Sequence, residues 1–364
     1  MRVIKIPKKS IEDLILDDFG GEREEKTVCI VRYGAWGDMI IASSLFPWFK
    51  ERGYKVCVNV SDRGLDIVKS DPNVDEIMVQ QTDQIPNTRL SEYWELMSKC
   101  FDKFVQLSES IEQTLLLMPR HSVMIDGKKA FIEANPNYYK DKAFIHNLCN
   151  VNYLERTHDL AGVPYEDESG SLFKPKFFPS NSEKKFAKDF KRRVKSKNLV
   201  MWVLSGSSVH KVYPWTDSVI AKFISERDDI SFVTVGDEAC QMLEIGWEKE
   251  RRVITKSGKL SIRNTLALLD VCNVVVGPET GVLNAASFTD AHKSIFLSHS
   301  SEENMTKHWT NTTAFEPDDC PCFPCHKMHF GFDTCNRDLR TGGALCAANI
   351  LPEKVYNDIE RHLR

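Results

Sequence analysis

Two glycine-containing turns with acidic side chains are the parts of this chain best suited to chemistry. The first, Arg32–Asp38 (RYGAWGD), directly follows the apolar run Val28–Val31. The second, Gly277–Gly281 (GPETG), directly follows Val274–Val276. Each pattern predicts a buried parallel strand, a tight turn and the start of a helix. Such turns place a carboxylate beside backbone N–H groups, which suits an enzyme that handles a phosphorylated substrate.

Asp38 is the candidate general base of the first turn. An aspartate carboxyl is ionised at neutral pH and can take the proton of an attacking hydroxyl, which contributes roughly 10²–10⁴ in rate. The alternative is that Asp38 only caps the helix that follows. A nicotinamide site is disfavoured, because the Gly-x-Gly-x-x-Gly spacing is absent and Asn59 and Ser61, rather than an acid, end the second strand.

The second turn is a candidate anion site. Gly281 lets the backbone approach a ligand closely, and the N–H groups of Thr280, Gly281 and Val282 would lie in the first turn of a helix, where an anion is favoured. The alternative is an ordinary strand–turn–helix in which Thr280 is the cap.

A loop rich in serine, Leu204–Trp215, favours the phosphate interpretation. It follows the first predicted strand of the second half and contains a glycine and Lys211. Small hydroxyl residues and glycine at the carboxyl end of a strand suit phosphate oxygens. A lysine 4 Å from a phosphate contributes a few kcal/mol at an effective dielectric near 20. Most surface lysines are simply solvated, but the position of Lys211 favours a contact with phosphate.

These residues need a framework of alternating strands and helices, and the sequence predicts one in each half. The predicted strands are Val28–Tyr33, Lys55–Val60, Glu76–Val79, Lys103–Leu107, Leu199–Leu204, Ser231–Val235, Arg252–Ile254, Asn273–Val276 and Ser294–Leu297. Helices are expected between them, including Asp38–Glu51, one that stops at Gly162, and Pro352–Leu363. Pro164–Ser182, rich in Pro, Ser and charge, is the predicted linker. Such alternation indicates two doubly wound α/β domains with parallel sheets.

Composition limits the classes of function. The chain has 364 residues, enough for two domains, and is 42% hydrophobic and 27% charged. Its net charge of −4 argues against general nucleic-acid binding. No run approaches the roughly eighteen apolar residues that span a bilayer. Because Met1–Lys26 mixes acidic and basic residues and does not resemble a signal peptide, we expect a cytoplasmic protein.

Five of the eleven cysteines lie between Cys320 and Cys346. Within this tail, Cys322, Cys325, Cys335 and Cys346 could hold a structural zinc, and the first spacing, Cys-x₂-Cys, is typical of zinc ligands. The alternative is that the thiols pack beneath the C-terminal helix. A disulfide is disfavoured in a reducing compartment. No metal is expected to take part in the chemistry.

The ordered set of these motifs resembles the glycosyltransferase family 9 enzymes, typified by the ADP-heptose:lipopolysaccharide heptosyltransferases. The resemblance runs from about Thr27 to the end of the chain. It depends on Gly-x-x-Gly-Asp ending at Asp38, on Ser205–Trp215, on Gly277–Gly281 and on the cysteine-rich tail.

The resemblance implies a GT-B fold, in which two Rossmann-like domains face each other across a cleft. We therefore expect an N-terminal extension (1–26), an acceptor domain (27–178), a nucleotide-sugar donor domain with the cysteine-rich tail (179–346) and a C-terminal helix (347–364). It also implies inverting, metal-independent transfer of a heptose-like sugar from a nucleotide diphosphate donor, ADP-heptose or similar, to a hydroxyl of an acceptor, here a lipopolysaccharide-type glycan. At most peripheral membrane contact is expected.

Site roles are carried over residue by residue. Asp38 matches the catalytic base and Lys211 the lysine that contacts the donor diphosphate, while Arg32 and Gly37 are expected near the acceptor. The remaining expected donor contacts are Ser205, Gly206, Ser207, Asp237, Glu238, Glu279, Thr280, Gly281 and Val282. Among these, Glu279 matches the acid that reads donor sugar hydroxyls.

The sequence also departs from the family pattern. Glu279 stands where an Asp is usual, Asn284 replaces a common His, and Ser298–Asn304 replaces a Phe-Gly-Pro-Thr turn. The alternatives are a sugar-nucleotide epimerase of the same fold and a GT-B nucleotide-sugar-binding protein without turnover. Acceptor-dependent release of nucleoside diphosphate would distinguish the transferase from both.

Overall fold

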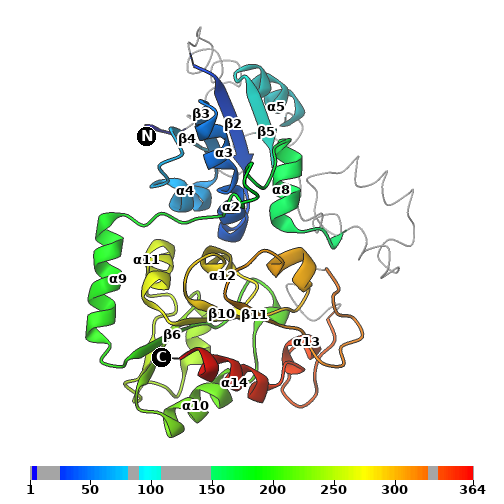
Figure 1. Cartoon of the computed structure of the whole chain (residues 1–364). Coiled ribbons are helices and arrows are strands. Elements are labelled where there is room, and N and C mark those ends of the chain that lie inside the picture. The colour runs from blue at the N-terminus through cyan, green and yellow to red at the C-terminus, as the bar shows by residue number, and fades with distance from the viewer. Residues whose placement is uncertain (1, 6–24, 81–89, 108–148, 327–334, 364) are drawn as a thin grey trace. The chain divides into compact units, whose positions relative to one another are not determined.

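The computed structural model describes residues 2–5, 25–80, 90–107, 149–326 and 335–363. These residues form two compact α/β units (Figure 1). The first contains the described residues up to 107 together with 153–178, and the second contains 149–152 and 179–363. The sheets of both units are parallel, as the alternation of strands and helices predicted.

The sheet of the first unit has five strands in the order β1-β4-β3-β2-β5. Their bounds are β1 Arg2–Lys5, β2 Thr27–Arg32, β3 Lys55–Val60, β4 Glu76–Val79 and β5 Lys103–Gln106. Strand β1 was not predicted. It pairs in parallel with β4, from Arg2 opposite Glu76 to Lys5 opposite Val79, so the chain before β2 contributes the edge of this sheet.

Five helices of the first unit are described: α2 Trp36–Ala42, α3 Leu45–Glu51, α4 Asp62–Val68, α5 Leu90–Lys99 and α8 Tyr153–Ala161. The prediction of one helix over Asp38–Glu51 is wrong, because it is interrupted at Ser43 and Ser44. Each serine hydroxyl donates to a carbonyl of the preceding turn, at 2.7 Å, which competes with the continuing helix. The stop at Gly162 is confirmed, with φ +64 directly after α8.

The sheet of the second unit has six strands in the order β11-β10-β9-β6-β7-β8. Their bounds are β6 Asn198–Val203, β7 Ile230–Val235, β8 Val253–Thr255, β9 Val274–Pro278, β10 His292–Phe296 and β11 Thr312–Phe315. The predicted strands are confirmed to within two residues at their ends. Strand β11 was missed, because it is a short edge strand whose first three side chains are only partly buried.

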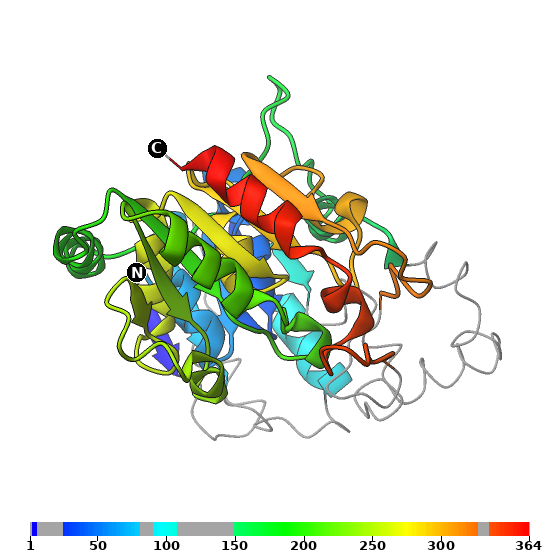
Figure 2. The same cartoon turned by 90° about the horizontal axis from the view of Figure 1, so that it is seen from below.

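Helices cover both faces of this second sheet. The described α-helices are α9 Asn181–Arg193, α10 Thr216–Glu226, α11 Ile262–Ala267, α12 Gly281–Ala286, α13 Leu345–Ala348 and α14 Pro352–His362. Helices α10 and α14 lie side by side on one face (Figure 2), where Phe223 and Tyr356 stack at 4.2 Å. Helices α11 and α12 lie on the other face (Figure 1). The core between these layers centres on Trp202, which is fully buried.

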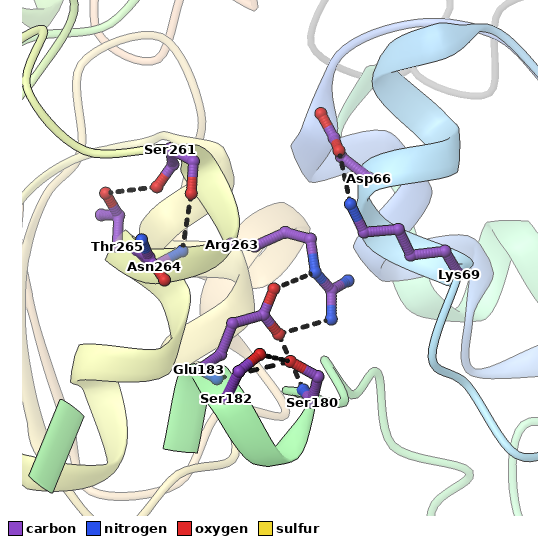
Figure 3. Close-up of polar contacts among 9 residues, drawn as sticks. All are labelled: Asp66, Lys69, Ser180, Ser182, Glu183, Ser261, Arg263, Asn264 and Thr265. Carbon is purple, nitrogen blue, oxygen red and sulfur yellow. Dashed lines mark hydrogen bonds and ion pairs between the residues drawn. The ribbon is translucent and has the colours of Figure 1, made fainter. Parts of the chain in front are cut away.

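A partly buried ion pair joins α9 to α11 (Figure 3). Ser180 caps α9 by accepting from the N–H of Glu183, whose carboxylate also binds Arg263 through two contacts of 2.6 and 2.8 Å. Burial raises the pKa of Glu183, but the bonds from Arg263 and Ser180 outweigh it and lower the pKa to about 2. The pair ties α9 to α11 within the second unit.

Candidate functional site

Asp38 lies just beyond the carboxyl end of β2 and is held by two partners. Its Oδ2 accepts a hydrogen bond from the N–H of Ala35 at 2.8 Å, and its Oδ1 lies 3.1 Å from Nη2 of Arg32. The N-cap of α2 is Ala35, so the alternative in which Asp38 is the N-cap is wrong in position; the carboxylate still bonds back to the cap residue from the third helical position, as in a capping box. The side chain is 28% exposed, and its carboxylate therefore remains accessible to solvent.

Gly34, four residues before Asp38, is required by this geometry. Gly34 has φ +132, and a Cβ added there would lie 2.5 Å from Oδ2 of Asp38. Any other residue would displace the carboxylate and strain the backbone. Arg32 is 4% exposed and also donates to the carbonyl of Leu107 at 2.5 Å. The structure thus places Arg32 and Gly37, the predicted acceptor contacts, in buried positions beside Asp38.

Sequence reasoning missed a polar network at the same edge of the first sheet. The hydroxyl oxygen of Tyr33 lies 2.6 Å from Oε1 of Gln80 and 2.9 Å from Oδ1 of Asn59, and the hydroxyl of Tyr93 lies 2.9 Å from the same Gln80 oxygen. Burial raises the pKa of Tyr33 well above its usual value, so its hydroxyl stays protonated. A signal was present, since Asn59 and Gln80 are polar residues at the ends of buried strands.

The second unit brings several predicted donor contacts together at the carboxyl ends of β6 and β9. Lys211 is 9% exposed and ends a short 3₁₀ turn, Val209–Lys211. A Cβ added to Gly206 would lie 2.6 Å from Cδ of Lys211 and 3.2 Å from Cγ2 of Thr280. Gly206, Lys211 and Thr280 are therefore in close contact, and only a residue without a side chain fits between the other two.

The other predicted donor contacts lie around this group. Ser205 Oγ is 3.0 Å from Sγ of Cys240, whose N–H donates to Asp237 at 3.1 Å, while Ser207 and Glu238 are exposed. Thr280 is confirmed as the N-cap of α12, because its hydroxyl accepts from the N–H of Leu283 at 3.4 Å. Gly281 and Val282 are the first two residues of that helix.

Glu279 has a more demanding set of partners than the sequence suggested. Its Oε1 accepts from the N–H groups of Ser298 and Ser300, and its Oε2 accepts from the Ser298 hydroxyl and Nδ1 of His299. These four contacts span 2.7–3.1 Å, and the residue is 3% exposed. Burial raises the pKa of Glu279, but the charges of His299, Lys211 and His210 and the bond from His299 hold it well below its usual range. All four of these hydrogen bonds to the Glu279 carboxylate therefore come from the loop after β10.

Two of the departures from the expected pattern, Glu279 and the loop after β10, therefore contact each other in the structure. The additional methylene of Glu279 carries its carboxylate to the loop Ser298–Ser301, and that loop supplies the four donors that a buried carboxylate needs. The loop after β10 also contacts the serine-rich loop Leu204–Trp215, since Nδ1 of His210 lies 2.7 Å from the Ser298 hydroxyl. Glu279 thereby links the ends of β6, β9 and β10.

Two groups of described side chains have the spacing of metal ligands: His210, Glu279 and His299, and separately His292, Asp358 and His362. The cysteines predicted to hold zinc do not form such a group. All eleven cysteines are described and none of them forms a disulfide; Sγ of Cys320 lies 3.6 Å from Sγ of Cys322. Burial raises the pKa of the Cys346 thiol. Cys346 is buried, whereas Cys320, Cys322, Cys325 and Cys335 are only partly buried, so the zinc site and the packed thiols both stay predictions.

Comparison with known proteins identifies the fold. No protein-family model matches the chain, and no curated protein matches its sequence. A glycosyltransferase family 9 protein from Veillonella parvula matches in structure with a TM-score of 0.64 at 15% identity, covering 94% of this chain and 98% of that one. E. coli ADP-heptose LPS heptosyltransferase II matches with 0.61 at 13%, covering 93% and 98%.

E. coli heptosyltransferase WaaC with ADP matches with 0.53 at 12% identity, covering 92% of this chain and 99% of that one. The chain therefore has the GT-B-like fold of these family 9 heptosyltransferases over more than nine-tenths of its length. Among the described residues, no helix combines the length and apolar character that a membrane crossing requires.

Proposed function

We propose that this chain is an inverting, metal-independent glycosyltransferase that moves a heptose-like sugar from a nucleoside diphosphate donor to an acceptor hydroxyl. The observation that carries the proposal is the match of nearly the whole chain to nearly whole heptosyltransferases, with Asp38 and Lys211 both following the carboxyl ends of parallel strands. In parallel α/β sheets, ligands bind at these ends. Fold alone would not assign an activity.

In the proposed reaction, the acceptor oxygen attacks the anomeric carbon of the donor sugar while the bond from that carbon to the diphosphate oxygen breaks. Asp38 takes the proton of the acceptor hydroxyl, and Arg32 keeps the carboxylate oriented. The departing diphosphate gains negative charge, which Lys211 and the backbone N–H groups of Thr280–Val282 stabilise. Attack opposite the leaving group inverts the configuration of the anomeric carbon.

Glu279 acts in this proposal mainly through its neighbours. Its carboxylate fixes Ser298–Ser300 and lies within electrostatic reach of Lys211. It therefore determines where the lysine and the loop after β10 meet the donor. ADP-heptose is the proposed donor and a lipopolysaccharide-type glycan the proposed acceptor, because the matching E. coli enzyme is named for both.

Donor binding and transfer are tested separately. Thermal-shift measurements with a panel of nucleotide sugars identify the donor, since a ligand at 100 times its Kd stabilises by about 2.7 kcal/mol. Release of nucleoside diphosphate is then measured with and without candidate glycans. Asp38→Asn should bind the donor like wild type but lose at least about 10²-fold in transfer rate. Lys211→Ala should weaken donor binding by about tenfold or more.

The matched control is Glu51→Gln, because Glu51 is an exposed acid that ends α3 before the amino end of β3, in the same unit as Asp38. It should leave both binding and transfer unchanged. Wild-type transfer by Asp38→Asn, with donor and acceptor saturating, would refute the role of Asp38. Donor conversion that needs no acceptor would indicate an epimerase instead, and donor binding without any turnover a binding protein.

A further inference from the structure

The two groups of side chains with metal-ligand spacing do not fit an ion. In the group on β10 and α14, the imidazole rings stack at 3.4 Å and 10°, so their in-plane lone pairs do not converge. In the group of His210, Glu279 and His299, both carboxylate oxygens already accept two hydrogen bonds each, and a carboxylate offers about four lone-pair positions. His299 therefore needs another explanation.

His299 lies at the carboxyl edge of the second sheet, where ligands of parallel α/β sheets bind. It follows β10, in the loop Ser298–Ser301, and its side chain is 8% exposed. The reaction proposed so far gives it no role. A buried imidazole at this edge is a candidate contact for the donor.

Two contacts hold the imidazole against the proposed diphosphate site. Nδ1 of His299 lies 2.7 Å from Oε2 of Glu279, which directly precedes Thr280. The ring also lies beside that of His210, with centroids 5.1 Å apart, and His210 directly precedes Lys211. His299 thus contacts the residues next to both proposed diphosphate contacts.

The two ring nitrogens of His299 differ in their partners. The Glu279 carboxylate only accepts, so Nδ1 is the donor of their bond. Within the part of the chain that the structure describes, Nε2 has one contact, 3.5 Å from the Ser300 hydroxyl, which is longer than a normal N–H···O bond. Nε2 therefore has capacity for a ligand. Because Nδ1 carries a proton, Nε2 can donate only in the imidazolium form.

The neighbouring charges suit an anion at this position. Burial raises the pKa of Glu279, and the charges of His299 and Lys211 are among the influences that lower it. One carboxylate thus faces several cationic groups, and each imidazole that takes a proton adds net positive charge. The other titratable residues packed against this pair, among those described, are His210, Lys211, His326 and Cys346. Two of them are histidines that titrate in the same range, so variants must separate them from His299.

We propose that His299 is a second cationic contact for the donor diphosphate. Nε2–H of its imidazolium donates to a diphosphate oxygen, while Glu279 holds Nδ1 and sets the direction of the ring. The bond strengthens as the diphosphate leaves, because its oxygens then gain negative charge. A charge-assisted hydrogen bond of this kind is worth about tenfold or more in affinity. This inference rests on the proposed function.

The protonation state of His299 gives the inference a readout that a merely structural role lacks. Because only the imidazolium donates from Nε2, donor binding takes up a proton. Binding weakens as the pH rises through the range in which histidine titrates.

Binding is measured by calorimetry on the full-length protein with ADP-heptose, ADP-glucose and UDP-glucose, whose diphosphate diesters do not titrate near neutral pH. We expect the wild type to bind at least one of them about tenfold more weakly at about pH 8.5 than at about pH 6. Proton uptake should appear as a binding enthalpy that depends on the ionisation enthalpy of the buffer.

His299→Asn separates the donor contact from the contact with Glu279. An asparagine amide can replace Nδ1 and keep the bond to Glu279, but it has no atom in the place of Nε2. The variant should keep the Tm of the wild type, bind the nucleotide sugar about tenfold more weakly at about pH 6 and lose the pH dependence. His362→Asn is the matched control, since it replaces a 34% exposed histidine of the same unit on α14. It should bind like wild type at every pH.

Wild-type affinity in His299→Asn, a pH dependence that this variant retains, or wild-type binding without proton uptake would each overturn the role of His299. Weaker binding of the nucleotide sugar with unchanged binding of ADP would place the contact on the sugar and overturn it as well. These outcomes leave the proposed transfer standing, whereas a wild type that binds no nucleotide sugar would refute both. If His299→Asn does not fold, proton uptake is measured in His210→Asn: retention supports His299, and loss overturns the inference.

Discussion

Replacement of Glu279 tests whether its carboxylate organises the loop after β10. In Glu279→Gln, the amide oxygen can keep the two backbone donors, Ser298 and Ser300, that now bind Oε1. The amide NH₂ then replaces Oε2 and faces the Ser298 hydroxyl and Nδ1 of His299, which lose their acceptor. In Glu279→Asp, the charge remains, but the carboxylate withdraws by about 1.5 Å, one C–C bond length.

The magnitudes follow from these contacts. Hydrogen bonds to a charged group contribute about 1.5–3 kcal/mol each, so the loss of two in Glu279→Gln costs about 3–6 kcal/mol. In Glu279→Asp, contacts of 2.7–3.1 Å lengthen to about 4 Å or more, and a buried charge loses its partners. Asp should therefore destabilise the loop at least as much as Gln, although it keeps the charge and is the residue usual in the family.

The assay is hydrogen exchange at the amides of Ser298 and Ser300, because both donate to Glu279. A loss of 3 kcal/mol in local stability corresponds to roughly 10²-fold faster exchange. Glu302→Gln is the control, since this exposed acid begins the short helix Glu302–Thr306 directly after the loop and should change exchange little. Exchange within about threefold of wild type in both Glu279 variants would refute the reasoning.

Two further predictions follow, one on the stability of the first unit and one on ligand binding by the second. Burial lowers the pKa of His158 from 6.5 to about 4 in the folded protein. As the pH falls, His158 is therefore protonated in the unfolded chain before it is protonated in the folded one. The contribution of His158 to the free energy of unfolding is complete above pH 6.5 and is lost as the pH falls toward 4. Urea titrations should show the stability advantage of wild type over His158→Gln shrinking by about 3 kcal/mol across that range, and a constant difference would contradict the assignment. Gly206→Ala places a methyl 2.6 Å from Cδ of Lys211 and should weaken nucleotide-sugar binding by about tenfold in calorimetry. In the control Gly343→Ala, the nearest atom to the added methyl is 3.5 Å away, so this variant should bind the nucleotide sugar normally. Equal binding by both variants would contradict a contact between Lys211 and the donor.

Much of the framework was predictable because its signals are local. Buried strands such as β3 and β4 are short apolar runs, and their bounds were predicted to the residue. The helix stop at Gly162 and the cap at Thr280 follow from backbone freedom and hydroxyl chemistry, which act within a few residues. The interruption at Ser43 was missed because serine tolerates both a helix and a break.

The candidate site was predictable in position but not in its contacts. The sequence placed Asp38 and Lys211 after buried strands, and the structure has them there. It could not show that Arg32 turns back onto Asp38 or that Gly206 packs against Lys211, because both depend on the path of a loop through space. The roles proposed for Asp38 and Lys211 in transfer stay predictions until the variants are assayed.

The amino-acid sequence by itself determined the alternation of strands and helices, the glycine turns and the chemical types available at their ends. Periodicity and turn propensity are properties of neighbouring residues, and they act before any long-range contact forms. Only the tertiary structure decided which distant groups meet. Glu279 finds its donors about twenty residues further along, and His292 meets Asp358 across 66 residues. Edge strands β1 and β11 likewise gain their hydrogen bonds from a sheet already built by others, so neither has a strong signal of its own.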